Sequence, residues 1–145
     1  MRIVGFTINK IQAERKNVIR DKLEIKSGLN IEDITKEEVD ISKSAAIKFD
    51  FTYSIDYAPN LAEIKIKGSV IALDEKEESK DLLKEWKKKK FNSPLKIPLF
   101  NFIMDKCTIK SLEIEEQLGL PFHIPLPRLT PTETQNPETR ANYTG

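Results

Sequence analysis

The most constraining feature of the sequence is the alternation of apolar and polar residues in two neighbouring segments, 47–57 and 62–72. In the first segment every odd position is apolar or aromatic and every even position is polar, which is the period of a half-buried β-strand. In the second segment the apolar residues lie mainly at even positions. Pro59 and Asn60, which are typical turn residues, lie between the two segments. The pattern therefore predicts a β-hairpin.

The register of this hairpin follows from the same alternation. A turn at residues 59–60 places Tyr57 opposite Ala62, so that the apolar faces of both strands coincide. A shift of one residue would send the two apolar sets to opposite faces, and the register is therefore strongly specified. The same register places Phe51 opposite Gly68, where an aromatic ring can lie across the glycine.

Length, charge and cysteine content limit the class of protein. The chain has 145 residues, which is the size of one domain. It carries 24 Lys and Arg against 23 Asp and Glu, and a net charge of +1 gives no reason to expect a nucleic acid or an anionic membrane as partner. Cys107 is the only cysteine, which excludes an intramolecular disulfide and is typical of a reducing compartment. Because no apolar stretch is long enough for a signal peptide or a membrane span, we expect a cytoplasmic protein.

Two segments precede the hairpin. Residues 3–15 are interpreted as a first strand whose apolar positions change parity at Ile11 and Ala13, which predicts an irregularity there. Residues 17–43 are less periodic: Leu23 and Ile25 alternate with polar residues, but the later apolar residues are scattered among acids. We interpret this segment as a short strand followed by a polar connection that contains a helical turn.

Two helices are predicted after the hairpin. Residues 74–90 begin with acids and end with lysines, as the helix dipole favours, but their apolar stripe is narrow. Residues 99–118 carry a broad apolar surface that could contact both a sheet and another subunit. Gly119 and Pro121 mark the end of this second helix, because glycine favours the left-handed cap conformation and proline cannot continue a helix.

The segment after this helix combines proline with large apolar residues. Between residues 120 and 131, four prolines alternate with apolar side chains, which favours an extended arm over a helix or an inner strand. An arm this apolar should lie in a groove of its own subunit or of a neighbour. Residues 132–145 contain almost no apolar residue, and we predict a disordered tail there. We therefore expect a single domain over residues 1–131, followed by that tail.

The sequence offers little for catalysis. It contains one histidine, His123, and one cysteine, so no metal site with Cys and His ligands and no pair of nucleophile and histidine can be assembled. We favour a packing role for both residues, with the imidazole of His123 as a polar tip. Paired acids such as Glu115 and Glu116 are interpreted as solvated, and no glycine pattern is typical of a phosphate-binding loop. We expect no enzyme, no catalytic or metal site and no cofactor.

The run Lys87–Lys90, beside Trp86 and Phe91, is the feature that could contact a nucleic acid. Lysines at a helix C-terminus also satisfy the helix dipole, and we favour this second interpretation. The aromatic residues of the hairpin share their face with isoleucines, so we expect them in the core rather than stacked on bases.

The order of these parts resembles that of the SecB export-chaperone family, with an opening strand, a central hairpin, a long helix and a Pro-rich apolar segment. The resemblance covers most of residues 3–131. The segments that carry it are residues 6–11, residues 49–73 with the Pro59-Asn60 loop, Phe91-Asn92-Ser93-Pro94 before the long helix, and Gly119-Leu120-Pro121-Phe122-His123-Ile124-Pro125-Leu126-Pro127.

The resemblance implies an α+β fold, in which the long helix of the C-terminal half packs on one face of a four-stranded antiparallel sheet and the Pro-rich arm is extended. It also implies a homotetramer, built as a dimer of dimers, that holds unfolded polypeptides without ATP. In two respects the sequence departs from the family. The usual fourth strand has no clear counterpart, and bacterial members are acidic and engage the SecA motor through that charge. This nearly neutral chain is therefore expected to act without SecA.

The leading hypothesis is an ATP-independent holdase for unfolded polypeptide. A holdase needs exposed, mobile apolar surface with charged flanks. Phe51 and Tyr53 would form the floor of the binding groove if the helix leaves that part of the sheet uncovered. The wall of the groove would be the arm, through Leu120, Phe122, Ile124, Leu126 and Leu129.

Three alternatives remain open. The arm could be a clasp that packs on its own subunit instead of a binding wall. The same scaffold could serve as an adaptor subunit for one partner, for example in a toxin-control system. A nucleic-acid-binding module that uses residues 86–91 is a further alternative.

Overall fold

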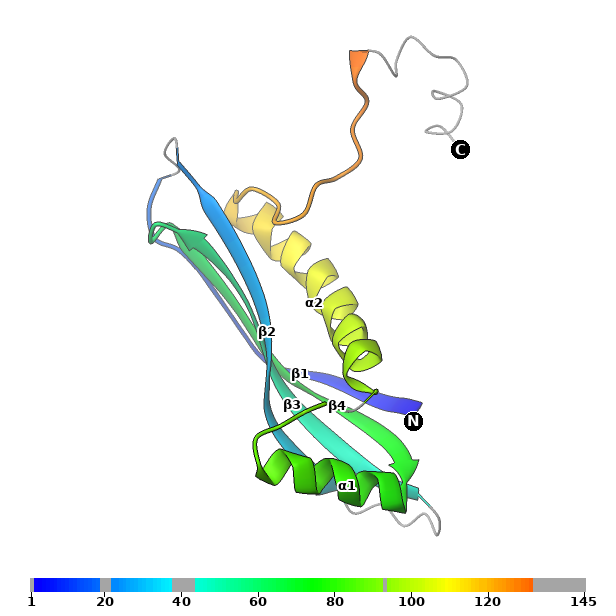
Figure 1. The fold of residues 1–145 in the computed structure, drawn as a ribbon. Coiled ribbons are helices and arrows are strands. Elements are labelled where there is room, and N and C mark those ends of the chain that lie inside the picture. The colour runs from blue at the N-terminus through cyan, green and yellow to red at the C-terminus, as the bar shows by residue number, and fades with distance from the viewer. Residues whose placement is uncertain (1, 19–21, 38–43, 93, 132–145) are drawn as a thin grey trace.

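The computed structural model describes residues 2–18, 22–37, 44–92 and 94–131. Four strands are followed by two helices: β1 (Arg2–Arg15), β2 (Glu24–Glu37), β3 (Ser44–Ala58), β4 (Ala62–Glu75), α1 (Lys76–Lys87) and α2 (Lys96–Leu118). The strands form one antiparallel sheet in the order β1-β4-β3-β2. Both helices lie on the same face of the sheet, α1 across one end and α2 along the remainder (Figure 1).

The predicted hairpin is confirmed as β3 and β4, including its register. Tyr57 pairs with Ala62 and Phe51 with Gly68. The apolar positions of both strands point toward the helices, and most of their side chains are fully buried. Gly68 is required at its position, because a Cβ atom there would lie 2.8 Å from the Phe51 ring and would overlap the carbonyl oxygen of Thr7.

The irregularity predicted in the first strand is also present. In β1 the pairing with β4 shifts between Ile8 and Lys10. This bulge resets the alternation, so that Ile8 before it and Ile11 after it face the same side of the sheet. The β-bulge therefore explains why the apolar positions of β1 change from even to odd residue numbers in the sequence.

The interpretation of residues 17–43 was wrong in one respect. Instead of a short strand and a polar connection, Glu24–Glu37 form one strand of 14 residues that pairs with β3 along its length. A shift in pairing between Ile31 and Asp33 breaks the alternation of this strand. With β2 at one edge, the sheet has the four strands that the resemblance implied, and the segment that follows the hairpin is a helix, as predicted. Residues 38–43, which belonged to the predicted connection, lie outside the described part of the chain.

Both predicted helices are confirmed. In α1, Leu82 is buried against the sheet, and the indole N–H of Trp86 donates a hydrogen bond to Asp33 at 3.1 Å. In α2 a series of residues spaced by four is fully buried: Leu99, Ile103, Cys107, Ser111 and Glu115. Gly119 ends α2 in the left-handed conformation, with φ 64°, as predicted.

No helix in the described residues is long and apolar enough to cross a membrane. The tail predicted over residues 132–145 lies outside the described part of the chain.

Candidate functional site

The arm, defined as residues 120–131, has a packed first half and an exposed second half. Leu120 is buried in the core, and His123 and Ile124 are partly buried. Leu126 and Leu129 are 41% and 48% exposed, and the coloured end of the arm, up to residue 131, runs away from the sheet (Figure 1). Residues 120–130 contain no helix or strand, as expected for a Pro-rich segment. The arm is therefore anchored at its start, and its apolar side chains become exposed in its second half.

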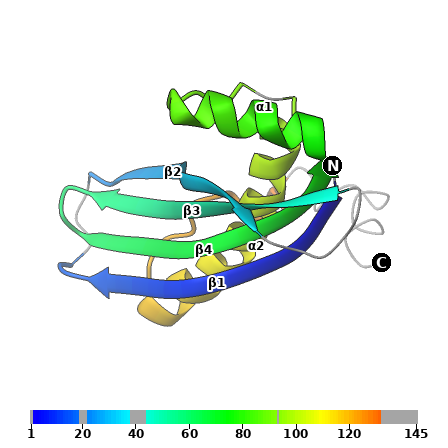
Figure 2. The same ribbon diagram turned by 90° about the horizontal axis from the view of Figure 1, so that it is seen from below.

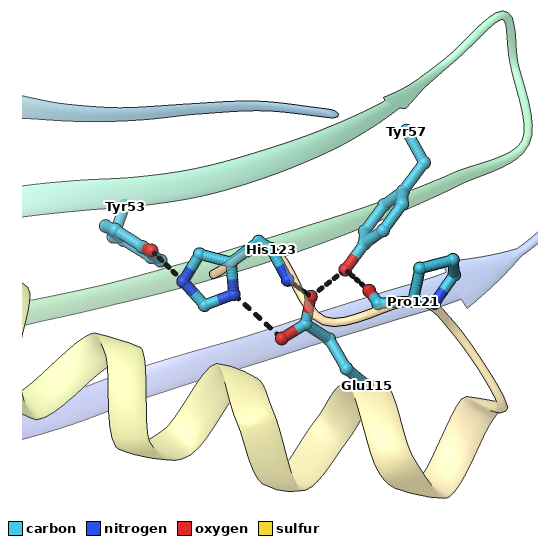
Figure 3. A network of polar contacts seen from close by, with 5 residues as sticks. All are labelled: Tyr53, Tyr57, Glu115, Pro121 and His123. Carbon is cyan, nitrogen blue, oxygen red and sulfur yellow. Dashed lines mark hydrogen bonds and ion pairs between the residues drawn. The ribbon is translucent and has the colours of Figure 1, made fainter. Parts of the chain in front are cut away.

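The anchor is a buried carboxylate on α2. The side chain of Glu115 is 0% exposed, and that of His123 is 4% exposed. Glu115 Oε1 lies 2.8 Å from His123 Nδ1, and Glu115 Oε2 accepts a hydrogen bond of 2.8 Å from the backbone N–H of His123 (Figure 3). The contact with a carboxylate places the imidazole proton on Nδ1. One glutamate of α2 therefore holds both the backbone and the ring of His123.

Two tyrosines of β3 complete this network. The Tyr57 hydroxyl donates to Glu115 Oε2 and also lies 3.2 Å from the carbonyl oxygen of Pro121. The Tyr53 hydroxyl lies 3.2 Å from His123 Nε2, the ring nitrogen that faces away from Glu115 (Figure 3). The network therefore joins three elements: α2, β3 and the start of the arm.

Burial raises the pKa of both tyrosines. For Tyr57, burial and then the hydrogen bond to Glu115 raise the pKa of the hydroxyl well above its ordinary value. For Tyr53, burial is the largest cause of a raised pKa. Both hydroxyls therefore keep their protons to a higher pH than a tyrosine in water would.

A second contact fixes the end of α2. The Arg15 guanidinium donates from Nη1 to the carbonyl oxygens of Leu118 and Gly119, at 3.0 and 3.1 Å. These oxygens are among the carbonyls that a helix leaves without partners at its C-terminus. Since Arg15 ends β1, the edge of the sheet is tied to the point where the arm begins.

The groove floor predicted at Phe51 and Tyr53 is closed in this structure. The two residues are 1% and 0% exposed, because α2 covers this part of the sheet. The ring of Phe51 stacks on Phe6 with centroids 5.7 Å apart. Phe51 and Tyr53 could form the floor of a groove only if this part of the sheet were uncovered, and it is not. Of the predicted wall, Leu120 is buried, and the other four residues are partly or fully exposed: Phe122, Ile124, Leu126 and Leu129.

Sequence reasoning missed Glu115 and assigned it to a solvated pair with Glu116. The structure corrects this, because only Glu116 is exposed. The signal was the spacing, since Glu115 follows Ser111 and Cys107 at intervals of four on the buried face of the helix. The packing role of Cys107 and the polar-tip role of His123 are confirmed. Burial raises the pKa of the Cys107 thiol to about 11.

Apolar side chains are also exposed outside the arm. On α2, Ile97 and Ile109 are 71% and 62% exposed, and Met104 is 37% exposed. The broad apolar surface expected on this helix is thus only partly used by the sheet of its own subunit. The remaining side chains could contact another molecule.

The lysine run at the end of α1 lacks stacking partners. Residues 87–90 are exposed, but Phe91 is buried and its ring lies 5.9 Å from that of Phe49. Trp86 packs against the core and donates to β2. Neither aromatic residue is presented for base stacking, which weakens the nucleic-acid alternative. Within the described residues, no group of three or more His, Cys, Asp and Glu side chains is arranged to hold a metal ion.

Comparison of the fold with solved structures finds a similar protein. No protein-family model matches the sequence, and a search of curated protein sequences finds no match. The structure resembles the SecB-like chaperone Rv1957 of Mycobacterium tuberculosis, solved in complex with a ChAD peptide from the antitoxin HigA1, Rv1956. The TM-score is 0.51 at 12% sequence identity, and the match covers 89% of this chain and 90% of the other. The chain therefore has a SecB-like α+β fold.

Proposed function

We propose that the chain is an ATP-independent chaperone that binds non-native polypeptides and is not an enzyme. The observation that carries the proposal is the arm, whose base is anchored by Glu115 and whose apolar end is exposed at Leu126 and Leu129. An apolar segment held out from the fold is stabilised when it contacts another apolar chain. The SecB-like fold supports the same function, since the similar protein is a chaperone in complex with a peptide.

The proposed binding surface consists of three exposed residues of the arm, Phe122, Leu126 and Leu129, together with the partly buried Ile124. Four residues that alternate with prolines present apolar side chains at low entropic cost, because proline restricts the backbone before binding. Phe51, Tyr53 and Leu120 belong to this surface only in a state in which the arm and α2 have moved. The network around Glu115 sets the free energy required for that movement.

We propose further that the chain assembles as a homotetramer, a dimer of dimers. Ile97 and Ile109 on α2 would be covered in the assembly, and their exposure in the single chain supports the proposal. Light-scattering mass measurement tests it directly. A tetramer is expected, and a strict monomer at micromolar concentration would contradict it.

Aggregation of an unfolding test protein, followed by light scattering without ATP, tests the chaperone activity. Suppression is expected at equimolar tetramer, and its absence would reject the proposal. Replacing both Leu126 and Leu129 with serine should weaken suppression several-fold without affecting stability, because both side chains are exposed. Val18→Ser is the matched control, since Val18 is 74% exposed and lies outside the arm. If the double variant and the control suppress aggregation equally, the arm is not the binding surface.

A second candidate is an adaptor that holds one folded or partly folded partner. The peptide in the complex of the similar protein comes from an antitoxin, which favours such a role as an alternative. The two functions differ in breadth. A holdase suppresses the aggregation of several unrelated test proteins, whereas an adaptor copurifies with one partner at fixed stoichiometry and suppresses the aggregation of that partner alone.

A further inference from the structure

The sheet face opposite the helices carries a hollow that the proposed chaperone function does not use. Figure 2 looks onto this face, with α2 behind the strands. The hollow has a volume of about 580 Å³ and lies at mid-sheet. Six of its ten lining residues are charged: Lys10, Glu32, Lys48, Asp50, Lys65 and Lys67.

The hollow lies where both edge strands are interrupted at the same level. Ile8 of β1 pairs with Gly68, Gly68 with Phe51, and Phe51 with Ile31 of β2. The pairing shifts directly after Ile8 and directly after Ile31. Bulges bend a strand and redirect its side chains, and a glycine in a strand marks a close approach or a bend. Two bulges in line with a glycine therefore shape this site within the sheet.

The bulge in β1 sends two consecutive side chains to the open face. Asn9 donates from Nδ2 to Ser69 Oγ at 3.3 Å, which places it on this face. Lys10 follows and lies directly opposite Lys67 of β4. Lys65 lies two residues from Lys67 on the same side of β4, and its ammonium group lies 3.4 Å from Glu63 Oε1. Since neighbouring strands are about 4.8 Å apart and alternate residues of a strand about 6.6 Å apart, the three lysines lie within roughly 10 Å.

The charges of Lys10 and Lys67 are not balanced within the described part of the chain. No described carboxylate lies within 4.0 Å of either ammonium group, although like charges directly opposite each other destabilise a sheet. The nearby Asp50 is engaged elsewhere, because it accepts a hydrogen bond of 2.8 Å from Ser69 Oγ and lies 3.9 Å from Lys48 Nζ. A shaped hollow with uncompensated positive charge is suited to an anion.

We propose that this hollow binds a short acidic segment of a partner polypeptide. The positive region is small and the lining of the hollow also includes Glu32 and Asp50, so it matches one or two carboxylates better than the continuous charge of a nucleic acid. The aromatic side chains of the described strand residues face the helices, and none is available on this face for a base. The hollow is separate from the arm, and it would bind an acidic segment whereas the arm would bind apolar ones. The proposal therefore does not depend on the chaperone function.

Fluorescence anisotropy with two labelled peptides tests the proposal on the full chain. One peptide carries a run of glutamates between Gly-Ser flanks, and the other carries glutamines at the same positions. The glutamate peptide is expected to bind and to weaken as salt rises, because exposed charges are screened. Replacing Lys10 and Lys67 with glutamine together should reduce its affinity about tenfold. Lys26→Gln is the matched control, since Lys26 lies on the same face of β2 beside Glu24 at 3.6 Å.

Three results would overturn the proposal: equal binding of the two peptides, no binding of the glutamate peptide, or an unchanged affinity in the double variant. If a labelled single-stranded oligonucleotide binds more tightly than the glutamate peptide, and the double variant loses that binding, the surface would be assigned to nucleic acid instead. Loss of folding is not expected in the double variant, because removing a pair of like charges that lie opposite each other should hold or raise the unfolding temperature. If the double variant nevertheless unfolds, Lys10→Gln alone, at an exposed position of the edge strand, gives the same test.

Discussion

The carboxylate of Glu115 is fully buried, although burying an ionised group is costly unless it is paired and hydrogen-bonded. It accepts hydrogen bonds from the Tyr57 hydroxyl and the backbone N–H of His123, and it contacts the imidazole of the same residue. The two donor residues come from segments 66 positions apart in the chain, as the numbers 57 and 123 show. A single buried charge thus fixes the position at which the arm leaves the core.

Replacing Glu115 with glutamine should destabilise the fold. The amide keeps the size of the side chain but offers one acceptor where two oxygens are used, so at least one buried donor loses its partner. We expect a loss of about 1–3 kcal/mol in the free energy of unfolding, measured by urea denaturation. Glu116→Gln is the control, because Glu116 is the exposed neighbour and should change stability by less than about 0.5 kcal/mol. Equal effects of the two substitutions would contradict the role of the network.

The raised pKa of Tyr57 predicts a loss of stability at alkaline pH. Above pH ~10 the unfolded chain ionises this tyrosine while the folded state keeps the proton, so the unfolded state binds fewer protons and stability falls as pH rises. Each such tyrosine contributes a slope of up to about 1.4 kcal/mol per pH unit. Tyr57→Phe should be less stable at pH 7, because Glu115 loses a donor, and should lose stability less steeply above pH 10 than the unsubstituted chain. Parallel pH profiles would show that Tyr57 titrates normally in the folded protein.

At the scale of elements, the sequence predicts best where alternation is unbroken. Residues 47–57 alternate without exception, and the hairpin was therefore predicted with its register. In β2 the shift between Ile31 and Asp33 places apolar residues on both parities, so that no single period remains. The strand also has one partner strand only, β3, and needs less apolar sequence than an inner strand. Its formation depends on pairing with β3, and the apolar pattern of residues 24–37 alone does not predict that pairing.

The site was predicted less well than the fold for a related reason. The arm follows from its prolines, but its anchor depends on which face of α2 is buried. A glutamate within a polar run is solvated unless a partner from elsewhere meets it. Here the partners Tyr57 and His123 are distant in sequence, and only the spacing of Cys107, Ser111 and Glu115 by four pointed to the buried face.

Gly68 provides a test of the contact between strands β1, β3 and β4. A Cβ atom at this position would press on the Phe51 ring and on the backbone of Thr7, and backbone yields little. We expect Gly68→Ala to lower the free energy of unfolding by about 1–3 kcal/mol, measured by urea denaturation. Gly28→Ala is the control, since the nearest atom to a Cβ there is Ser54 Oγ at 4.0 Å. A Gly68→Ala variant as stable as the control would mean that the sheet relaxes at its bulge without cost.

At the scale of the whole molecule, the fold divides its two faces between two kinds of surface. The helix side is apolar and is closed by α2 and the base of the arm, and the opposite side is charged and open. Exposing the closed side requires the arm to leave Glu115 and α2 to lift from β3. Client binding by the floor residues Phe51 and Tyr53 would therefore be coupled to an opening of the core, whereas binding by the arm end alone would not.

The thiol of Cys107 distinguishes these two modes, because it is the only cysteine of the sequence and lies fully buried on the side of α2 that faces the sheet. Burial raises its pKa to about 11, so at pH 8 roughly one thiol in a thousand is ionised even before access is considered. We expect labelling by a thiol reagent to be at least about a hundredfold slower than in the urea-unfolded chain. Glu115→Gln should accelerate labelling, since it weakens the closed state, whereas Glu116→Gln should not. If an unfolded client accelerates labelling of the unsubstituted chain, binding opens the core; if the rate is unchanged while aggregation is suppressed, the client is held by the exposed end of the arm.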